Sequence, residues 1–136
     1  MSATRIPAKL ISIFLCFAWP VPMSGSFAAG SPHRVVTCPY LKSGLQFDVP
    51  AKFGEMPAID FDYPAKASQF SLRDGNLLLV AMDESEPSRV RIVISAQLNK
   101  TKGTYDGQIL VDMGGNQLQL YNGSVHCKVA SGAATH

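Results

Sequence analysis

The sequence is poor in the residues and motifs that serve catalysis. It contains three histidines: His33 and His136 lie near the expected ends of the folded domain, and His126 lies on the polar side of an expected strand. No nucleophile elbow (Gly-x-Ser-x-Gly), zinc-protease motif (His-Glu-x-x-His), phosphate-binding loop or dinucleotide fingerprint (Gly-x-Gly-x-x-Gly) occurs. We therefore expect a protein that is not an enzyme and that holds no cofactor or metal ion.

The carboxylates offer one further route to chemistry. Asp60 and Asp62 are two residues apart and would share one face of a strand. Two carboxylates hydrolyse glycosides when both face one cleft at about 5–9.5 Å from each other. A solvated acidic face explains this pair more simply, and a solvated turn explains Asp83, Glu84 and Glu86. A hydrolase is therefore the weakest of the functional hypotheses.

Long apolar runs are also scarce, apart from one near the start of the chain. Arg5 and Lys9 form a positively charged start. Residues 10–19 follow as an apolar run that is too short to span a bilayer. Residues 26–28 (Ser-Phe-Ala) place small side chains at positions −3 and −1 of a cleavage site. The pattern predicts a secretory signal peptide over residues 1–28, export to the periplasm and no stable membrane anchor.

An excess of charge of one sign is absent from the predicted mature chain. The full sequence has 12 basic and 10 acidic residues, and Arg5 and Lys9 leave with the signal peptide, so 10 of each remain. A neutral chain has no general attraction for a polyanion. We therefore expect no nucleic-acid partner.

Helical periodicity is missing as well. No long window repeats its apolar residues every 3.6 positions, whereas many short runs alternate between apolar and polar residues. Such alternation is typical of strands with one buried face and one wet face. Nine such runs predict about eight short strands, and the runs lie at residues 34–38, 45–49, 59–63, 69–72, 76–82, 88–96, 108–113, 116–121 and 124–129. The run at 76–82 is apolar on both faces, so its periodicity also fits a buried helical turn.

Glycine-containing pairs predict how these strands connect. Asp74-Gly75, Gly114-Gly115 and Asn122-Gly123 each suit a two-residue hairpin turn, because their residues tolerate positive φ. The last two would join residues 103–129 into a three-stranded meander. The fold class is therefore all-β: a small antiparallel β-barrel or half-open sandwich of about eight strands. We place this domain at residues 29–130, followed by a flexible tail at 131–136.

The cysteine count falls to two once the signal peptide is removed. Cys16 lies inside that segment, which leaves Cys38 and Cys127 near opposite ends of the domain. Cysteines of an exported domain pair in an oxidising compartment. We predict one disulfide between them, and the chain-entropy model gives such a bridge roughly 4–5 kcal/mol of stabilisation.

One stretch of the sequence resembles a known motif. Residues 101–120 read TKGTYDGQILVDMGGNQLQL, in which Tyr105, Gly107 and Gly115 match a tyrosine and two glycines of the C-type lysozyme inhibitor (MliC/PliC) family. Members of this family also pair a cysteine of the first strand with one near the last. The family consists of small exported proteins of Gram-negative bacteria with an eight-stranded antiparallel barrel.

The resemblance implies a function and a set of contact residues. It implies a periplasmic inhibitor that plugs the cleft of a lysozyme-type peptidoglycan hydrolase, either host lysozyme or an endogenous muramidase. In the family, a serine and a lysine bond to the catalytic carboxylates of the enzyme. Here Thr101 stands at the serine position, Gly114 stands at the lysine position, and Asp112 replaces an aromatic residue. We therefore expect partner contacts at Thr101, Lys102, Tyr105, Asp112 and Gly114, with Lys102 supplying the missing cation.

A second hypothesis belongs to a different class. The lost lysine at Gly114 favours an exported β-barrel module without an enzyme target, which binds a small ligand or a component of the cell envelope. An exposed strand edge would also allow self-association. We therefore expect a monomer or a weak homodimer.

Overall fold

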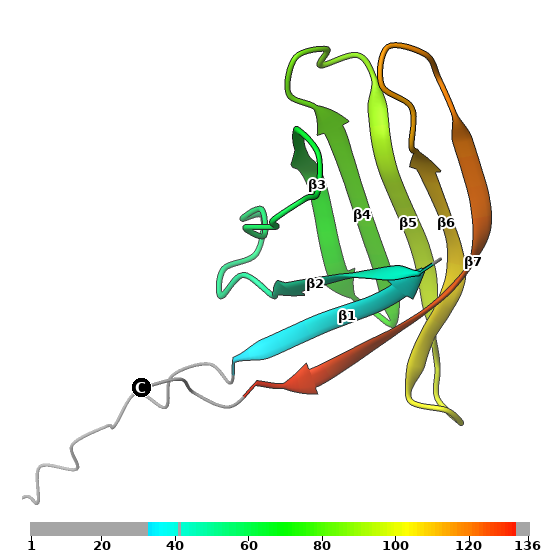
Figure 1. Ribbon diagram of the computed structural model, residues 1–136. Helices are drawn as coiled ribbons and strands as arrows, with labels where there is room; N and C mark the ends of the chain where they lie inside the picture. Colours follow the sequence, from blue (N-terminus) through cyan, green and yellow to red (C-terminus); the bar gives the residue numbers. More distant parts are fainter. Residues whose placement is uncertain (1–32, 41, 133–136) are drawn as a thin grey trace, which may run out of the picture.

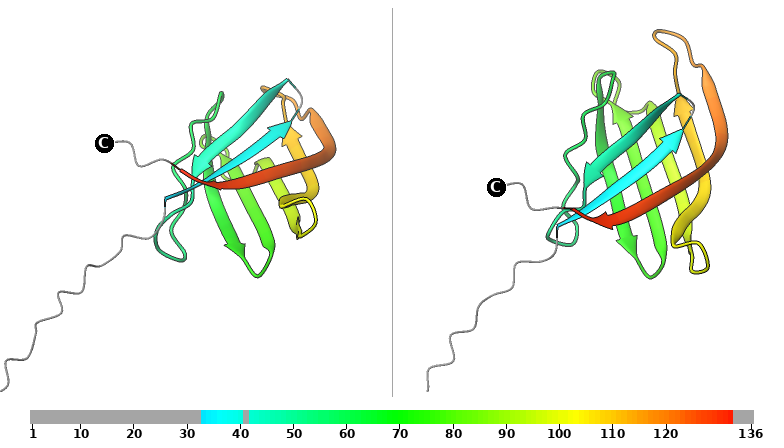
Figure 2. Two further views of the ribbon diagram at one scale, coloured as in Figure 1. Left: turned by 90° about the horizontal axis from the view of Figure 1, so that it is seen from below. Right: turned by 60° about the horizontal axis from the view of Figure 1, so that its bottom comes forward.

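Seven antiparallel strands form the part of the chain that the computed structural model describes, residues 33–40 and 42–132. They are β1 (Arg34–Tyr40), β2 (Ser43–Asp48), β3 (Ala65–Arg73), β4 (Asn76–Asp83), β5 (Val90–Asn99), β6 (Thr104–Asp112) and β7 (Leu120–Ser131). Their order in the sheet is β2-β1-β7-β6-β5-β4-β3. The sheet curls around its inner face into a half-barrel, which leaves β2 and β3 as edges (Figures 1 and 2).

The predicted fold class is confirmed, with one strand fewer than expected. The described residues are all-β and antiparallel, and no helix among them is long and apolar enough to cross a membrane. The predicted signal peptide lies outside the described residues, as do residues 133–136 of the expected tail. β7 itself continues to Ser131, where we expected the tail to begin.

The core fills the concave side of the sheet. Its buried members come from every strand, and the largest fully buried side chains include Leu77, Leu79, Ile92, Ile94 and Ile109. The predicted disulfide is confirmed: Cys38 of β1 and Cys127 of β7 are bonded, and both side chains are fully buried. The bridge joins the N-terminal strand pair to the rest of the sheet.

The Asp74-Gly75 turn is confirmed. Asp74 and Gly75 have φ values of 53° and 72° and connect β3 to β4. Two successive positive φ values are what the twist of a two-residue hairpin requires.

The Asn122-Gly123 turn is wrong. Both residues lie inside β7, where Asn122 pairs with Leu110 and Gly123 with Ile109 of β6. Gly123 does not have a positive φ. Instead, the phenol of Tyr121 occupies the space that a Cβ atom at Gly123 would need. The glycine therefore provides room for an aromatic ring rather than conformational freedom.

The Gly114-Gly115 turn is longer than predicted. β6 ends at Asp112 and β7 begins at Leu120, so residues 113–119 form the connection between these strands. Leu118 and Leu120 are 63% and 56% exposed, so they do not form the buried face that their alternation predicts. A backbone hydrogen bond from Met113 to the carbonyl of Gln119 closes the base of the loop.

The predicted strand at residues 59–63 is also wrong. These residues lie in the segment between β2 and β3. Pro57 and Pro64 flank them, and they pair with no described strand. Ile59, Phe61 and Tyr63 are nevertheless partly buried against the core. Their alternation predicted burial correctly, but the apolar side chains pack without strand pairing.

Candidate functional site

The residues predicted to contact a partner lie at two ends of one strand. Thr101 and Lys102 lie in the turn between β5 and β6, whereas Asp112 and Gly114 lie where β6 gives way to the next loop (Figure 1). β6 has nine residues, so these ends are roughly 27 Å apart at about 3.4 Å per residue. The structure does not bring the loops at 99–103 and 112–116 together.

The turn at residues 100–103 is held in one conformation by the residue before it. The Asn99 side-chain oxygen accepts hydrogen bonds from the backbone N–H groups of Thr101 and Lys102, both at 3.2 Å. The Asn99 carbonyl accepts another from the N–H of Gly103 at 2.8 Å. Gly103 has a φ of 67°, which a residue with a side chain rarely adopts. We call residues 100–103 the tip.

A second layer of hydrogen bonds supports Asn99. The Asp106 carboxylate accepts from the Asn99 amide at 3.0 Å and from the Thr104 hydroxyl at 2.7 Å, and it lies 2.9 Å from Nδ1 of His126. The bonds from His126, Thr104 and Asn99 lower the pKa of Asp106 to about 2. The carboxylate is therefore ionised at neutral pH and stays available as an acceptor.

The two lysines of the tip form no ion pair with the described part of the chain. Lys100, Thr101 and Lys102 are exposed. Within residues 33–40 and 42–132, neither lysine lies within 4.0 Å of a carboxylate oxygen. Tyr105 is partly buried, packs against the core, and pairs with Cys127. Its packing anchors the base of the tip.

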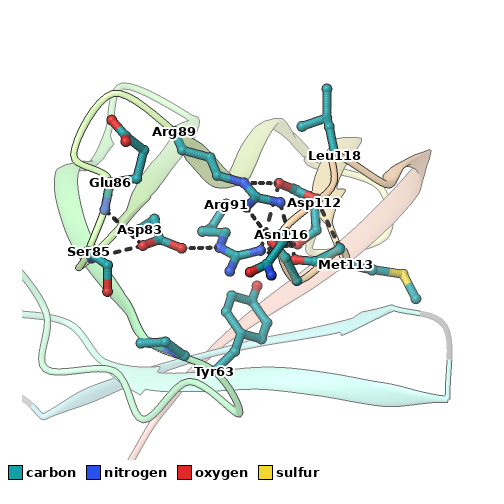
Figure 3. A pocket seen from close by; sticks show the side chains of 13 residues that line it. Tyr63, Asp83, Ser85, Glu86, Arg89, Arg91, Asp112, Met113, Asn116 and Leu118 are labelled. Carbon is teal, nitrogen blue, oxygen red and sulfur yellow. Dashed lines mark hydrogen bonds and ion pairs between the residues drawn. The ribbon is translucent and has the colours of Figure 1, made fainter.

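A pocket of about 880 Å³ lies at the opposite end of β6 (Figure 3). Its walls are the connection between β4 and β5, the loop at residues 113–119, and Tyr63 and Pro64 before β3. Asp112 and Gly114 both line it. Two of the five predicted contact residues therefore belong to this pocket.

A β-bulge turns one arginine into the pocket. Ala81 pairs with Ile92, but the next residue, Met82, pairs with Val90, so Arg91 is an extra residue in β5. An extra residue bends its strand and re-aims its side chain. Arg91 is consequently only 7% exposed, although alternation along β5 predicts a solvated position. The alternation in the sequence gives no sign of the bulge, so it could not predict the burial of this arginine.

The pocket floor is a network of ion pairs: two close ones and a third, longer one between Nη1 of Arg91 and Asp112 at 3.7 Å. Nε of Arg91 donates to Asp83 at 2.7 Å, and Nε of Arg89 donates to Asp112 at 2.5 Å. Asp112 is fully buried and also accepts from the backbone N–H groups of Gly114 and Gln119 at 2.9 and 3.0 Å. The Arg89 hydrogen bond, together with these two, holds the pKa of Asp112 well below its usual value.

Asp83 completes the network from the end of β4. It lies in phase with the inward-facing residues of that strand and is 7% exposed. One carboxylate oxygen accepts from the backbone N–H groups of Ser85 and Glu86 at 2.8 and 3.0 Å. The Ser85 bond is the largest of the influences that lower the pKa of Asp83. The acidic turn expected to be solvated thus places one carboxylate inside.

Gly114 contributes its backbone rather than a side chain. Its carbonyl accepts hydrogen bonds from both Arg89 and Arg91. A Cβ atom at this position would collide with the carbonyl of Gln117. The position aligned with the family's lysine therefore has no room for any side chain in this loop conformation.

The sequence pattern did not predict Tyr63 as a pocket residue. Its ring centre lies 5.3 Å from Cζ of Arg91, and its hydroxyl points toward the guanidinium group and Asn116 in Figure 3. That hydroxyl oxygen is buried and has no hydrogen-bond partner within the described part of the chain. Burial, more than any other influence, raises the pKa of the phenol above its usual value.

Other routes to chemistry find little support among the described residues. Asp60 and Asp62 are exposed and line neither this pocket nor the smaller one beside Phe53. No group of three His, Cys, Asp or Glu side chains in residues 33–40 and 42–132 is arranged to hold a metal ion. Comparisons with protein-family models, curated proteins and solved structures find no match to this chain.

Proposed function

We propose that this protein is an exported binder and inhibitor of lysozyme-type peptidoglycan hydrolases that acts through the tip. The observation that carries the proposal is an exposed, cationic turn whose backbone is already ordered by Asn99. The target class comes from the resemblance of residues 101–120 to the C-type lysozyme inhibitor family. The target is either host lysozyme or an endogenous muramidase.

The chemistry of such a cleft suits this tip. A lysozyme-type hydrolase carries a catalytic pair of carboxylates between the walls of its cleft. Lys102 would donate a charge-assisted hydrogen bond to one of them, which is worth about 1.5–3 kcal/mol. The Thr101 hydroxyl would add a neutral hydrogen bond. Because the turn is ordered before binding, little conformational entropy is lost on association.

The proposal divides the expected contact residues by role. Thr101 and Lys102 form the contact surface, and Tyr105 anchors the hairpin that carries them. Asp112 and Gly114 face inward at the other end of β6, so they hold the loop at residues 113–119. A single cleft is therefore expected to receive the tip alone.

Two further observations support this reading. The Cys38–Cys127 disulfide is fully buried, and structural disulfides persist in oxidising compartments such as the periplasm. Side chains fill the concave face of the sheet, which disfavours a ligand held inside the half-barrel. These observations fit an exported protein that binds a hydrolase with its outer surface, as we propose.

The test is a calorimetric titration of the oxidised protein against a hen-type lysozyme, with lysozyme turnover followed in parallel. We expect binding that slows turnover, and we expect Lys102→Ala to weaken binding at least about tenfold, as the loss of a charge-assisted bond implies. Lys66→Ala is the matched control, because Lys66 is an exposed lysine on the edge strand β3. Unchanged binding by both Lys102→Ala and Thr101→Ala would reject the tip as the contact surface.

A further inference from the structure

The pocket at the far end of β6 offers hydrogen-bond donors that the fold does not use. Nε and Nη1 of Arg91 are bonded to Asp83, Gly114 and the carbonyl of Asp112, whereas Nη2 has no hydrogen-bond partner within the described part of the chain. Arg91 and Tyr63 both line the pocket, so their unpaired groups lie at its wall. The Tyr63 hydroxyl is a second unused donor beside the same guanidinium group.

The acceptors of the pocket floor, by contrast, are occupied. Both oxygens of Asp83 and both oxygens of Asp112 accept hydrogen bonds from arginine side chains or backbone N–H groups. A molecule entering the pocket therefore meets free donors and few free acceptors. Its polar group has to be an acceptor.

The charge of the site limits that acceptor to a single negative charge at most. Arg89 and Arg91 are balanced by Asp83 and Asp112, and Glu86 adds a carboxylate at the rim. The paired floor is neutral, so it has no excess positive charge to hold a dianion such as phosphate. A carboxylate is a singly charged, two-oxygen acceptor that suits an N–H donor and an O–H donor side by side.

Two apolar side chains form part of the pocket rim. Met113 and Leu118 line it and are 58% and 63% exposed. Large apolar side chains beside a polar floor match a ligand with a polar end and a hydrocarbon end. Such a ligand would cover these side chains while its polar end reaches Arg91.

We propose that this pocket binds a small monocarboxylate with an apolar chain. One carboxylate oxygen accepts from Nη2 of Arg91 and the hydroxyl of Tyr63, and the chain lies against Met113 and Leu118. The hydroxyl of Tyr63 is a donor at neutral pH, because the pKa of a tyrosine phenol is ordinarily about 10 and burial raises it further. This site is independent of the proposed hydrolase binding, since the tip lies at the other end of β6.

The experiment is a two-dimensional NMR titration of the exported, oxidised protein. The ligands are hexanoate and hexanamide, which is a neutral molecule of the same shape. We expect hexanoate to shift the backbone amides of Ser85, Gly114 and Gly115 in a saturable way. Hexanamide should bind about tenfold more weakly, because it lacks the charge that strengthens the Arg91 bond.

Two variants separate the proposed donor from general effects on the fold. Tyr63→Phe keeps the ring and removes a buried hydroxyl that has no hydrogen-bond partner among residues 33–40 and 42–132, so its thermal midpoint should not fall below that of the wild type. Its affinity for hexanoate should fall on the order of tenfold. Tyr121→Phe removes a hydroxyl outside the pocket lining and should bind hexanoate as the wild type does.

Three results would overturn the proposal. They are the absence of saturable shifts with hexanoate, equal shifts with hexanamide, and unchanged hexanoate affinity in Tyr63→Phe. The lysozyme titration is unaffected by any of them, so failure here is distinguishable from failure of the proposed function.

Discussion

The two ends of β6 use similar residue types in opposite ways. At the tip, Asn99 and Asp106 hold the backbone of a turn, and the lysines of that turn are exposed and pair with no carboxylate in the part of the chain that the structure describes. At the pocket, Arg89 and Arg91 are bound by carboxylates and carbonyl groups of the same chain. The pocket arginines are thus satisfied inside the fold, whereas the tip lysines are left available, and this difference is why we propose the tip as the surface that contacts a hydrolase.

The comparison also distinguishes two sources of order. The tip is ordered by local hydrogen bonds, which span at most a few residues around Asn99 apart from the contact with His126. The pocket is ordered by side chains at the end of β4, around the start of β5 and at the end of β6, together with backbone groups of the loop after β6. Changes at the pocket should therefore affect global stability, whereas changes at the tip should affect mainly binding.

The largest expected effect is the loss of stability when the disulfide is removed, because this bridge stabilises the sheet that carries both ends of β6. Replacing Cys38 and Cys127 by alanine removes the only covalent link between β1 and β7 within the described residues. We expect the free energy of unfolding to fall by about 2–5 kcal/mol. Denaturant unfolding of the double variant beside the oxidised wild type measures it, and equal midpoints would contradict the stabilising role of the bridge.

A change confined to the pocket comes next. Asp112→Ala leaves two buried or half-buried arginines without their shared carboxylate, and removal of one partner from a buried pair destabilises by about 3–5 kcal/mol. We expect a loss in the lower part of that range, because Arg89 is 19% exposed. Asp60→Ala is the control, since its side chain is exposed and should change stability by less than about 0.5 kcal/mol. Equal unfolding midpoints for the two variants would show that the network is not required for stability.

A smaller effect separates the tip by its response to acid. The pKa of Asp106 is lowered from 3.8 to about 2 by its hydrogen bonds, so this group favours the folded state above about pH 4. Its contribution should disappear as the pH falls from about 4 to about 2. Unfolding measured across this range should be less dependent on pH in Asp106→Asn than in the wild type. Parallel profiles would show that the hydrogen bonds to Asp106 do not stabilise the fold.

The smallest effect concerns one backbone conformation. Gly103→Ala places a side chain at a φ of 67°, which should cost about 1 kcal/mol. Gly115→Ala is a matched control, because Gly115 lacks a positive φ and a Cβ there meets no atom within 4 Å. Chemical denaturation of both variants compares them. Equal stability would mean that the tip does not depend on its left-handed residue.

Local patterns in the sequence predicted much of the fold. Alternation identified β1, β2 and β5, and Asp74-Gly75 identified a hairpin, because both depend on residues close together in the chain. The cysteine count identified the disulfide without any knowledge of strand order. These features follow from side-chain periodicity and from backbone preferences alone.

Tertiary packing decided the features that the sequence did not predict. Gly123 provides space for the ring of Tyr121, so a strong turn signal lies inside a strand. The pocket depends on a bulge at Arg91, and one extra residue in a strand leaves no mark in apolar alternation. An arginine-rich strand start next to an acidic turn was the only available hint of the ion-pair network. The tip itself was predicted as a loop, but its order depends on the Asn99 side chain.

One NMR experiment tests the central proposal that the tip lysines, which have no carboxylate partner among the described residues, contact the hydrolase, rather than the paired arginines of the pocket. The isotopically labelled protein is titrated with unlabelled lysozyme, and its backbone amides are followed along β6 and its two flanking loops. We expect the amides of residues 99–104 to shift or broaden first, while those of residues 112–119 keep their positions. Perturbation confined to residues 112–119 would contradict the account, because it would place the partner on the end whose charges are already satisfied.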